Sequence, residues 1–229
     1  MIAETLAQVK RRIEGSAKKA GRNPNDITLV CVTKSADISQ IREALSLGVT
    51  DIGENRVNEA LSKHSSLGDL PGKLRWHMLG HLQTNKVRKC LKVFDIIHSL
   101  DSLRLAVELD KQAKAENKRI DCFVEVNLSG EPARYGISPG DTCDFIKQAS
   151  LLANLHIIGL MAMAPIIDNP EDARPYFKEL RILKDRLLDE KIPNTDITEL
   201  SMGMTQDFEV AIEEGSTFVR IGTAIFSGK

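Results

Sequence analysis

The stretch LVCVTKS, residues 29–35, decides between the two fold classes that the chain's alternating pattern allows. Its four apolar residues predict a buried strand, which runs directly into Thr33, Lys34 and Ser35. A doubly wound open sheet that binds a dinucleotide carries a glycine-rich GxGxxG turn after its first strand. No such turn follows Val32. The stretch therefore favours a closed parallel barrel, in which functional residues lie at the carboxyl ends of the strands.

The rest of the chain repeats this unit. Short apolar runs alternate with segments of helical periodicity, which is the pattern of parallel βα units. The predicted strands are residues 27–32, 50–52, 74–79, 94–98, 120–127, 155–160, 197–200 and 217–221. The predicted helices between them are residues 38–47, 55–64, 84–91, 102–116, 141–152, 172–190 and 206–214. No proline- or glycine-rich linker divides the chain. The pattern predicts a single (β/α)₈ TIM barrel over residues 1–229, a fold that typically takes about 250 residues.

An additional helix is predicted before the first strand. Ile2, Leu6, Val9 and Ile13 recur at helical spacing and define one apolar face. The basic residues of the same segment, among them the run 10–12, are expected to form a solvated face while the apolar side packs on the barrel.

The composition excludes several function classes. The chain is 42% hydrophobic and 28% charged, with a formal net charge of -1, which argues against nucleic acid or an anionic membrane as the main partner. No apolar run approaches the roughly 18 residues of a membrane span. The cysteines form no CxxC pair and the histidines no HExxH pattern, so we expect no metal site and reduced cysteines in a cytoplasmic protein. With no obvious dimer stripe, we expect a monomer.

The ends of the seventh and eighth predicted strands are typical of a phosphate site. The loops after these two strands often bind phosphate in such barrels. Ser201 and Thr223 offer hydroxyl groups, Gly222 lets the backbone approach an anion closely, and Arg220 adds a permanent cation. The alternative is a pair of ordinary glycine turns with Arg220 in a salt bridge. Spacing alone leaves both open.

Lys34, at the end of the first predicted strand, also allows two interpretations. Its side chain either extends from the strand end into water or serves as an imine-forming amine. At the mouth of an apolar barrel the amine is expected to be partly desolvated, and Arg220 adds a nearby cation; both favour the neutral, nucleophilic form. An imine-forming lysine facing a phosphate site suggests a phosphorylated sugar or pyridoxal 5′-phosphate (PLP) as ligand.

Motifs along almost the whole chain resemble the pyridoxal phosphate homeostasis proteins, also called the YggS/PROSC family. The resemblance rests on VTK at 32–34, GENRVNE at 53–59, WHMLGHLQTNK at 76–86, VNLSGEPARYGI at 126–137, GLMAM at 159–163, LSMGMTQDFEVAI at 200–212 and GSTFVRIGTAIFSG at 215–228. It implies a PLP-binding barrel similar to the N-terminal domain of alanine racemase. Many family members have tyrosine where this chain has Arg56, on one side of the pocket.

The resemblance implies a role for each site residue. Lys34 would form a Schiff base with the cofactor aldehyde. Ser201, Gly222 and Thr223 would hold its phosphate, and Arg220 would face the pyridine nitrogen. Asn55, Met161 and Met204 would line the ring pocket.

The function that the resemblance implies is PLP and amino-acid homeostasis without proficient catalysis. Its partners would be PLP, free amino acids and PLP-dependent apoenzymes as recipients. A protonated pyridine nitrogen, which makes the cofactor a strong electron sink, usually lies beside a carboxylate, whereas Arg220 keeps its own proton. Racemases place a histidine over the ring where this chain has Met161. A PLP-dependent racemase or lyase, and a phosphosugar aldolase using Lys34, remain the alternatives.

Overall fold

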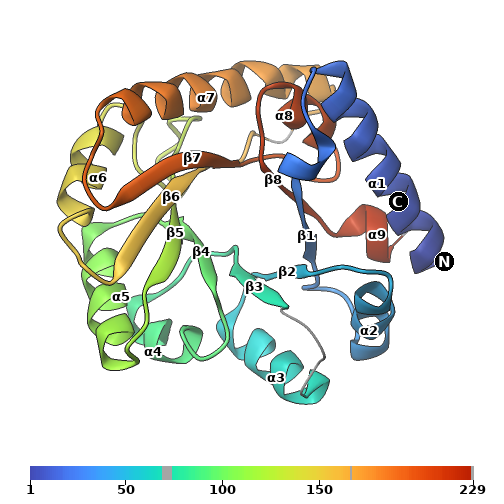
Figure 1. The fold of residues 1–229 in the computed structure, drawn as a ribbon, viewed down its shortest axis with the longest axis horizontal. Helices are drawn as coiled ribbons and strands as arrows, with labels where there is room; N and C mark the ends of the chain where they lie inside the picture. Colours follow the sequence, from blue (N-terminus) through green and yellow to red (C-terminus); the bar gives the residue numbers. More distant parts are fainter. Residues whose placement is uncertain (69–73, 166, 228–229) are drawn as a thin grey trace.

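The predicted barrel is confirmed by a computed structural model that describes residues 1–68, 74–165 and 167–227. Eight parallel strands pair in chain order, and β8 closes the ring on β1 (Figure 1). The strands are β1 Thr28–Val32, β2 Asp51–Glu54, β3 Arg75–Met78, β4 Ile96–Leu100, β5 Ile120–Glu125, β6 Leu155–Met161, β7 Thr195–Ser201 and β8 Phe218–Ile221.

Helices surround the ring in Figure 1. They are α1 Ile2–Lys19, α2 Ile38–Ser46, α3 Val57–Leu67, α4 Val87–Cys90, α5 Leu103–Ala115, α6 Thr142–Ala149, α7 Arg174–Asp189, α8 Phe208–Glu213 and α9 Thr223–Phe226, with 3₁₀ turns at Pro24–Asp26, Thr84–Lys86 and Pro170–Ala173. Two predicted helices, 84–91 and 172–190, differ from the prediction because each begins as a 3₁₀ turn. The short helix α9 was not predicted. None of the helices in the described ranges has the length and apolar character that crossing a membrane requires.

The N-terminal helix packs as its periodicity predicts. Ile2, Leu6, Val9 and Ile13 are buried, and α1 lies along α8 and α9 on the outside of the barrel (Figure 1). The guanidinium of Arg12 lies 4.6 Å from the centroid of the Phe208 ring. The helix therefore covers the closure of the ring, beside β8 and β1.

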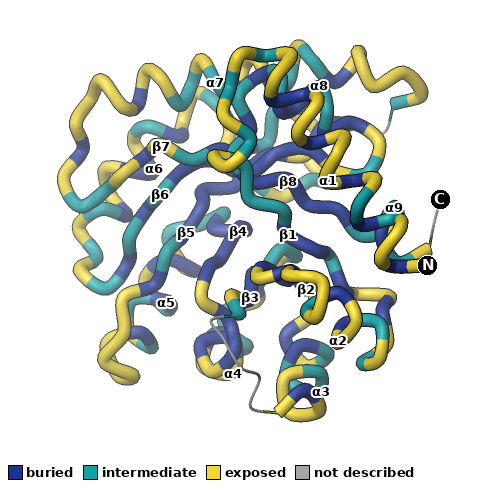
Figure 2. The backbone as a smooth tube through the Cα atoms, turned by 45° about the vertical axis from the view of Figure 1, so that its right-hand side comes forward, coloured by how far each residue is buried: buried dark blue, intermediate teal, exposed yellow. Residues whose placement is uncertain are grey.

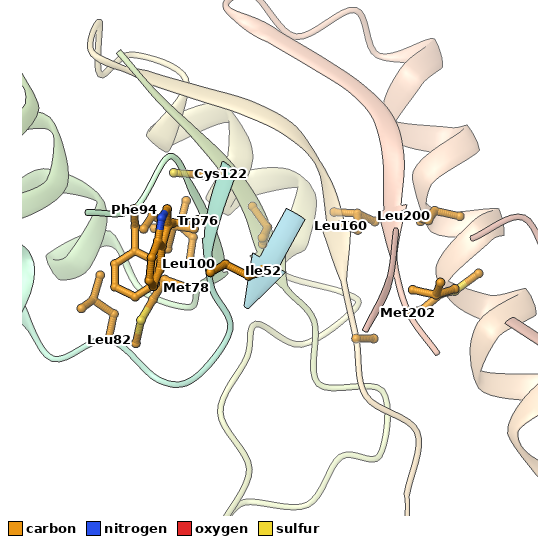
Figure 3. Packing of buried hydrophobic residues seen from close by; sticks show 14 of the residues in the cluster. Ile52, Trp76, Met78, Leu82, Phe94, Leu100, Cys122, Leu160, Leu200 and Met202 are labelled. Carbon is orange, nitrogen blue, oxygen red and sulfur yellow. The ribbon is translucent and has the colours of Figure 1, made fainter. Parts of the chain in front are cut away.

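Two layers of buried side chains build the core. The larger layer lies between the strands and the helices, and most residues of the strands are buried (Figure 2). Figure 3 shows part of this layer, including Trp76, whose ring meets the ring of Phe94 edge-on at a centroid distance of 6.4 Å. Because both faces of a parallel sheet are covered, its strands appear as nearly continuous apolar runs, which is why they were visible in the sequence.

The second layer fills the inside of the ring and is unusually polar. Its apolar part consists of Val30, Ile96, Phe123, Met161 and Phe218. The remaining volume holds buried polar side chains, including those of His77, His98, Ser201 and Arg220. Barrel interiors are mostly filled by branched apolar residues, so these polar groups need hydrogen-bond partners inside the ring.

Candidate functional site

A cavity of about 450 Å³ opens at the carboxyl ends of the strands. This volume lies within the range of small-molecule sites, roughly 300–1,000 Å³. All of the predicted site residues except Ser201 line the cavity, namely Lys34, Asn55, Met161, Met204, Arg220, Gly222 and Thr223. The barrel thus gathers residues from distant parts of the chain at one mouth.

Lys34 lies in the loop between β1 and α2, two residues beyond the end of the strand. Its side chain lines the cavity but the residue is exposed, so the expected partial desolvation is wrong. The amine is open to solvent and to a ligand, because the loop carries it past the apolar interior.

A buried ion pair fixes the start of this loop. Glu54 is fully buried and its Oε1 accepts hydrogen bonds from Thr33 Oγ1 at 2.6 Å and from Lys63 Nζ at 2.7 Å. Lys63 Nζ also donates to the Thr33 carbonyl oxygen at 2.6 Å. Side chains of β2 and α3 therefore hold the residue directly before Lys34, which limits how far its backbone can move.

Arg220 is the buried cation of the cavity. Its NH1 donates to Ser201 Oγ at 2.6 Å and its NH2 donates to the Ala162 carbonyl oxygen at 3.0 Å. Burial lowers the pKa of Arg220 to about 10, although the charges of Asp207 and Glu125 act in the opposite direction. The guanidinium still carries its proton at neutral pH. No ion pair within 4 Å engages it in the described residues, so the salt-bridge alternative is not what the structure contains.

Two glycines shape the turns after β7 and β8. A Cβ at Gly222 would lie 2.8 Å from the Val32 carbonyl oxygen, so only glycine lets the end of β8 approach the end of β1 this closely. Gly203 has φ +93°, and a Cβ there would lie 2.6 Å from the Cβ of Ala211. The exposed Thr223 follows Gly222 and opens α9.

Methionines form the apolar part of the lining. Met161 is 1% exposed and forms part of the cavity floor, whereas Met163 and Met204 are 43% and 38% exposed near its rim. Their unbranched side chains adapt to the shape of a planar ligand.

Ser201 differs from its predicted role. It is fully buried, does not line the cavity, and accepts the hydrogen bond from Arg220. Its Oγ also lies 2.8 Å from His98 Nδ1. Ser201 faces the inside of the ring beneath Arg220, where both of its hydrogen-bonding functions are in use, so it is not placed to hold an anion in the cavity.

Several lining residues were not singled out from the sequence. They follow β6 and β7 and include Met163, Ala164, Pro165, Thr205, Gln206 and Asp207. Asp207 Oδ1 accepts from the backbone N–H of Met204 at 2.6 Å and fixes that turn. Burial raises the pKa of Asp207, against the lowering effect of this hydrogen bond and of Arg220. The rule that selected Ser201, as a residue that follows a predicted strand, would also have selected these neighbours.

Arg56, the departure from the family motif, lies outside this cavity. It lines an adjacent cavity of about 420 Å³ that shares Asn55 with the first. Its guanidinium pairs with Glu59 at 3.0 Å and the side chain is 77% exposed. The substitution therefore leaves the lining around Lys34 and Arg220 unchanged.

Glu125, at the end of β5, is a further buried acid inside the barrel. Burial is the main cause that raises its pKa to about 7 from 4.5; the negative charge of Asp101 acts in the same direction and Arg220 acts against it. Because the folded-state pKa exceeds the unfolded one, the folded state binds more protons between these values, and its stability falls as the pH rises through 7.

Replacing Glu125 with glutamine is expected to raise the free energy of unfolding at pH 8 by about 2 kcal/mol, with a smaller gain at pH 5. The amide has the size of the carboxyl group but never takes a charge. Urea denaturation at both pH values measures the effect, with Glu116→Gln on the surface as the control. An equal effect of Glu125→Gln at the two pH values would contradict the assigned direction.

Comparisons with known proteins agree with this geometry. Residues 5–229 match the family described as alanine racemase, N-terminal domain. The chain is 44% identical over 223 residues to the pyridoxal phosphate homeostasis protein of Aquifex aeolicus, covering 97% of this chain and 96% of the relative. It is 40% identical over 228 residues to the protein of the same name from Pseudomonas aeruginosa, covering 100% and 96%. Its fold is similar to PipY of Synechococcus elongatus, solved with PLP bound, at 37% identity and a TM-score of 0.87, covering 99% of this chain and 100% of PipY.

Proposed function

Because the chain belongs to the family of the pyridoxal phosphate homeostasis proteins, built on the alanine racemase N-terminal domain fold, we propose that it binds PLP in the cavity at the barrel mouth and serves PLP and amino-acid homeostasis without proficient catalysis. The observation that carries the proposal is the meeting of an open amine, a buried guanidinium and a glycine turn in one cavity, at Lys34, Arg220 and Gly222.

The lining fits each part of PLP. The Lys34 amine matches the aldehyde, with which it would form a Schiff base. The Gly222–Thr223 turn and its hydroxyl match the phosphate, because glycine turns and helix starts expose N–H donors to anions. Met161 and Met204 match the faces of an aromatic ring. Arg220 can only donate hydrogen bonds, so it matches an unprotonated pyridine nitrogen.

When bound, PLP supplies an aldehyde that condenses reversibly with amines, so that one amine can replace another, and a ring that withdraws electrons when its nitrogen is protonated. Arg220 opposes that protonation, because a buried cation that keeps its proton disfavours a second positive charge beside it. The lining therefore suits holding and releasing an aldehyde better than stabilising a carbanion.

The small number of possible catalytic bases in the cavity lining also supports a non-catalytic role. Among the described lining residues the ionisable side chains are those of Lys34, Asp207 and Arg220. Racemisation needs a base on each face of the substrate, within hydrogen-bond reach of its proton. Asp207 is the one other candidate base among these lining residues, and its carboxylate already accepts a hydrogen bond from the Met204 amide. The partners that we propose are free amino acids and PLP-dependent apoenzymes, met by a monomer in the cytoplasm.

Incubation of the PLP-loaded protein with L-alanine or D-alanine in deuterated water tests the non-catalytic part. We expect α-deuterium exchange no faster than that caused by an equal concentration of free PLP, as followed by NMR. An alanine racemase serves as the positive control. Exchange well above the free cofactor, lost in Asp207→Asn, would instead support the racemase alternative.

A further inference from the structure

A continuous chain of hydrogen bonds runs through the barrel interior. It leads from Arg220, near the carboxyl end of β8, to Asp51, at the amino end of β2. Arg220 donates to Ser201 Oγ at 2.6 Å, and Ser201 Oγ lies 2.8 Å from His98 Nδ1. His98 Nε2 lies 2.9 Å from His77 Nδ1, and His77 Nε2 lies 2.9 Å from Asp51 Oδ1. The links join β8, β7, β4, β3 and β2. The four residues beyond Arg220 are at most 3% exposed.

The two ends of the chain determine its polarity. A guanidinium only donates, so Ser201 Oγ accepts from Arg220 and its own hydrogen is free for His98 Nδ1. At the other end Asp51 is an acceptor. Burial alone would raise its pKa, but hydrogen bonds from His77, Thr50 and Arg75 outweigh burial and lower it. His77 therefore donates through Nε2 to Asp51.

The histidines between these ends are neutral. Burial lowers the pKa of His77 despite the nearby Asp51, and burial is also the main cause that lowers the pKa of His98 well below its usual value; the charge of Arg220, and that of His77 whenever it is protonated, act in the same direction. A neutral His77 that donates from Nε2 accepts at Nδ1, so His98 donates from Nε2 and accepts from Ser201 at Nδ1. Every donor in the chain then points away from Arg220 toward Asp51.

We propose that Ser201, His98, His77 and Asp51 are positioning residues that hold the Arg220 guanidinium in one orientation toward the cavity. Ser201 acts through Arg220 and does not bind the ligand itself. The ligand part of this inference rests on the proposed function, whereas the polarity of the chain belongs to the protein alone.

Comparison of PLP with pyridoxal, which lacks the phosphate, separates positioning from phosphate binding. Ser201→Ala and His98→Phe are expected to weaken both ligands by the same factor, about fivefold, leaving their affinity ratio unchanged. Thr223→Val is expected to weaken PLP alone and to lower that ratio. Ser216→Ala is the matched control, because Ser216 is an equally buried serine whose Oγ donates to the Met202 carbonyl oxygen at 2.7 Å; it should leave both affinities unchanged.

Nitrogen-15 NMR of the ligand-free protein tests the polarity without any cofactor. Both His77 and His98 are expected to carry their proton on Nε2 with a bare Nδ1, and Ser201→Ala should shift the His98 Nδ1 signal. Thermal melting confirms that each variant is folded. If His98→Phe does not fold, Ser201→Ala, which removes a single heavy atom, still tests the inference.

Three results would overturn the inference. A lower PLP-to-pyridoxal ratio in Ser201→Ala would make Ser201 a phosphate ligand. Unchanged affinities in folded Ser201→Ala would leave the chain without a positioning role. A proton on His98 Nδ1 would reverse the polarity. If the wild-type protein binds neither ligand, the proposed function fails, and the NMR experiment still decides the polarity of the chain.

Discussion

Replacing Lys34 with alanine is expected to abolish the visible absorbance band that PLP gives on binding, and to leave the cofactor removable by gel filtration. Among the described lining residues Lys34 is the one primary amine, so its loss removes the group that would bind the aldehyde covalently. The residue is exposed, and removing a surface side chain usually changes stability by less than about 0.5 kcal/mol. The variant is therefore expected to fold normally and to fail in cofactor retention alone.

Lys86→Ala is the matched control for this experiment. Lys86 lines the adjacent cavity, so it tests whether any lysine near the mouth serves equally well. The control should keep the wild-type spectrum. A visible band of full intensity in Lys34→Ala would show that another amine binds the aldehyde.

Replacing Arg220 with alanine is expected to have the second largest effect. The substitution removes a charged donor from the cavity and leaves Ser201 and the Ala162 carbonyl without their partner. A hydrogen bond to a charged group is worth about 1.5–3 kcal/mol, which corresponds to roughly 10- to 100-fold weaker PLP binding. Titration followed by absorbance measures the loss, and pyridoxal should lose affinity by a similar factor.

Arg12→Ala controls for the general loss of a guanidinium. Arg12 pairs with Glu209 on the outside of the barrel, at 2.8 Å, and its removal should leave the affinity for PLP unchanged. An Arg220→Ala variant that is folded and binds PLP as tightly as the wild type would show that this side chain does not face the ligand.

The fold could be predicted because its signal is repeated. Each covered parallel strand is a short apolar run, and eight of them alternate with helical segments. Single boundaries were less accurate: β4 extends to Leu100 rather than His98, and the helix predicted at 84–91 begins as a 3₁₀ turn. Tertiary packing decides such ends, and local periodicity does not record it.

The depth of a side chain inside the ring could not be predicted. Ser201 ends β7 and Arg220 lies one residue before the end of β8, which suggested that both face the cavity. In the closed ring Arg220 lines the cavity and donates to Ser201, which does not line it. Lys34 shows the opposite error, because the loop carries it farther out than the sequence suggested.

The hydrogen bonds between the polar side chains inside the ring could not be predicted from the sequence either. His77 and His98 are 21 residues apart, and Ser201 lies a further 103 residues along the chain. Their hydrogen bonds exist because barrel closure turns inward-facing positions of β3, β4 and β7 toward one another. Period-two alternation indicates that such residues are buried, but it does not indicate which of them meet.

Borohydride reduction of the PLP-loaded protein, followed by peptide mapping, tests the central claim most directly. Reduction converts the bond between an amine and the aldehyde into a stable label at the residue that carried it. The expected label is on Lys34, in one peptide and in near-stoichiometric amount. A label on another lysine, or no label on protein that was fully loaded before reduction, would contradict the account.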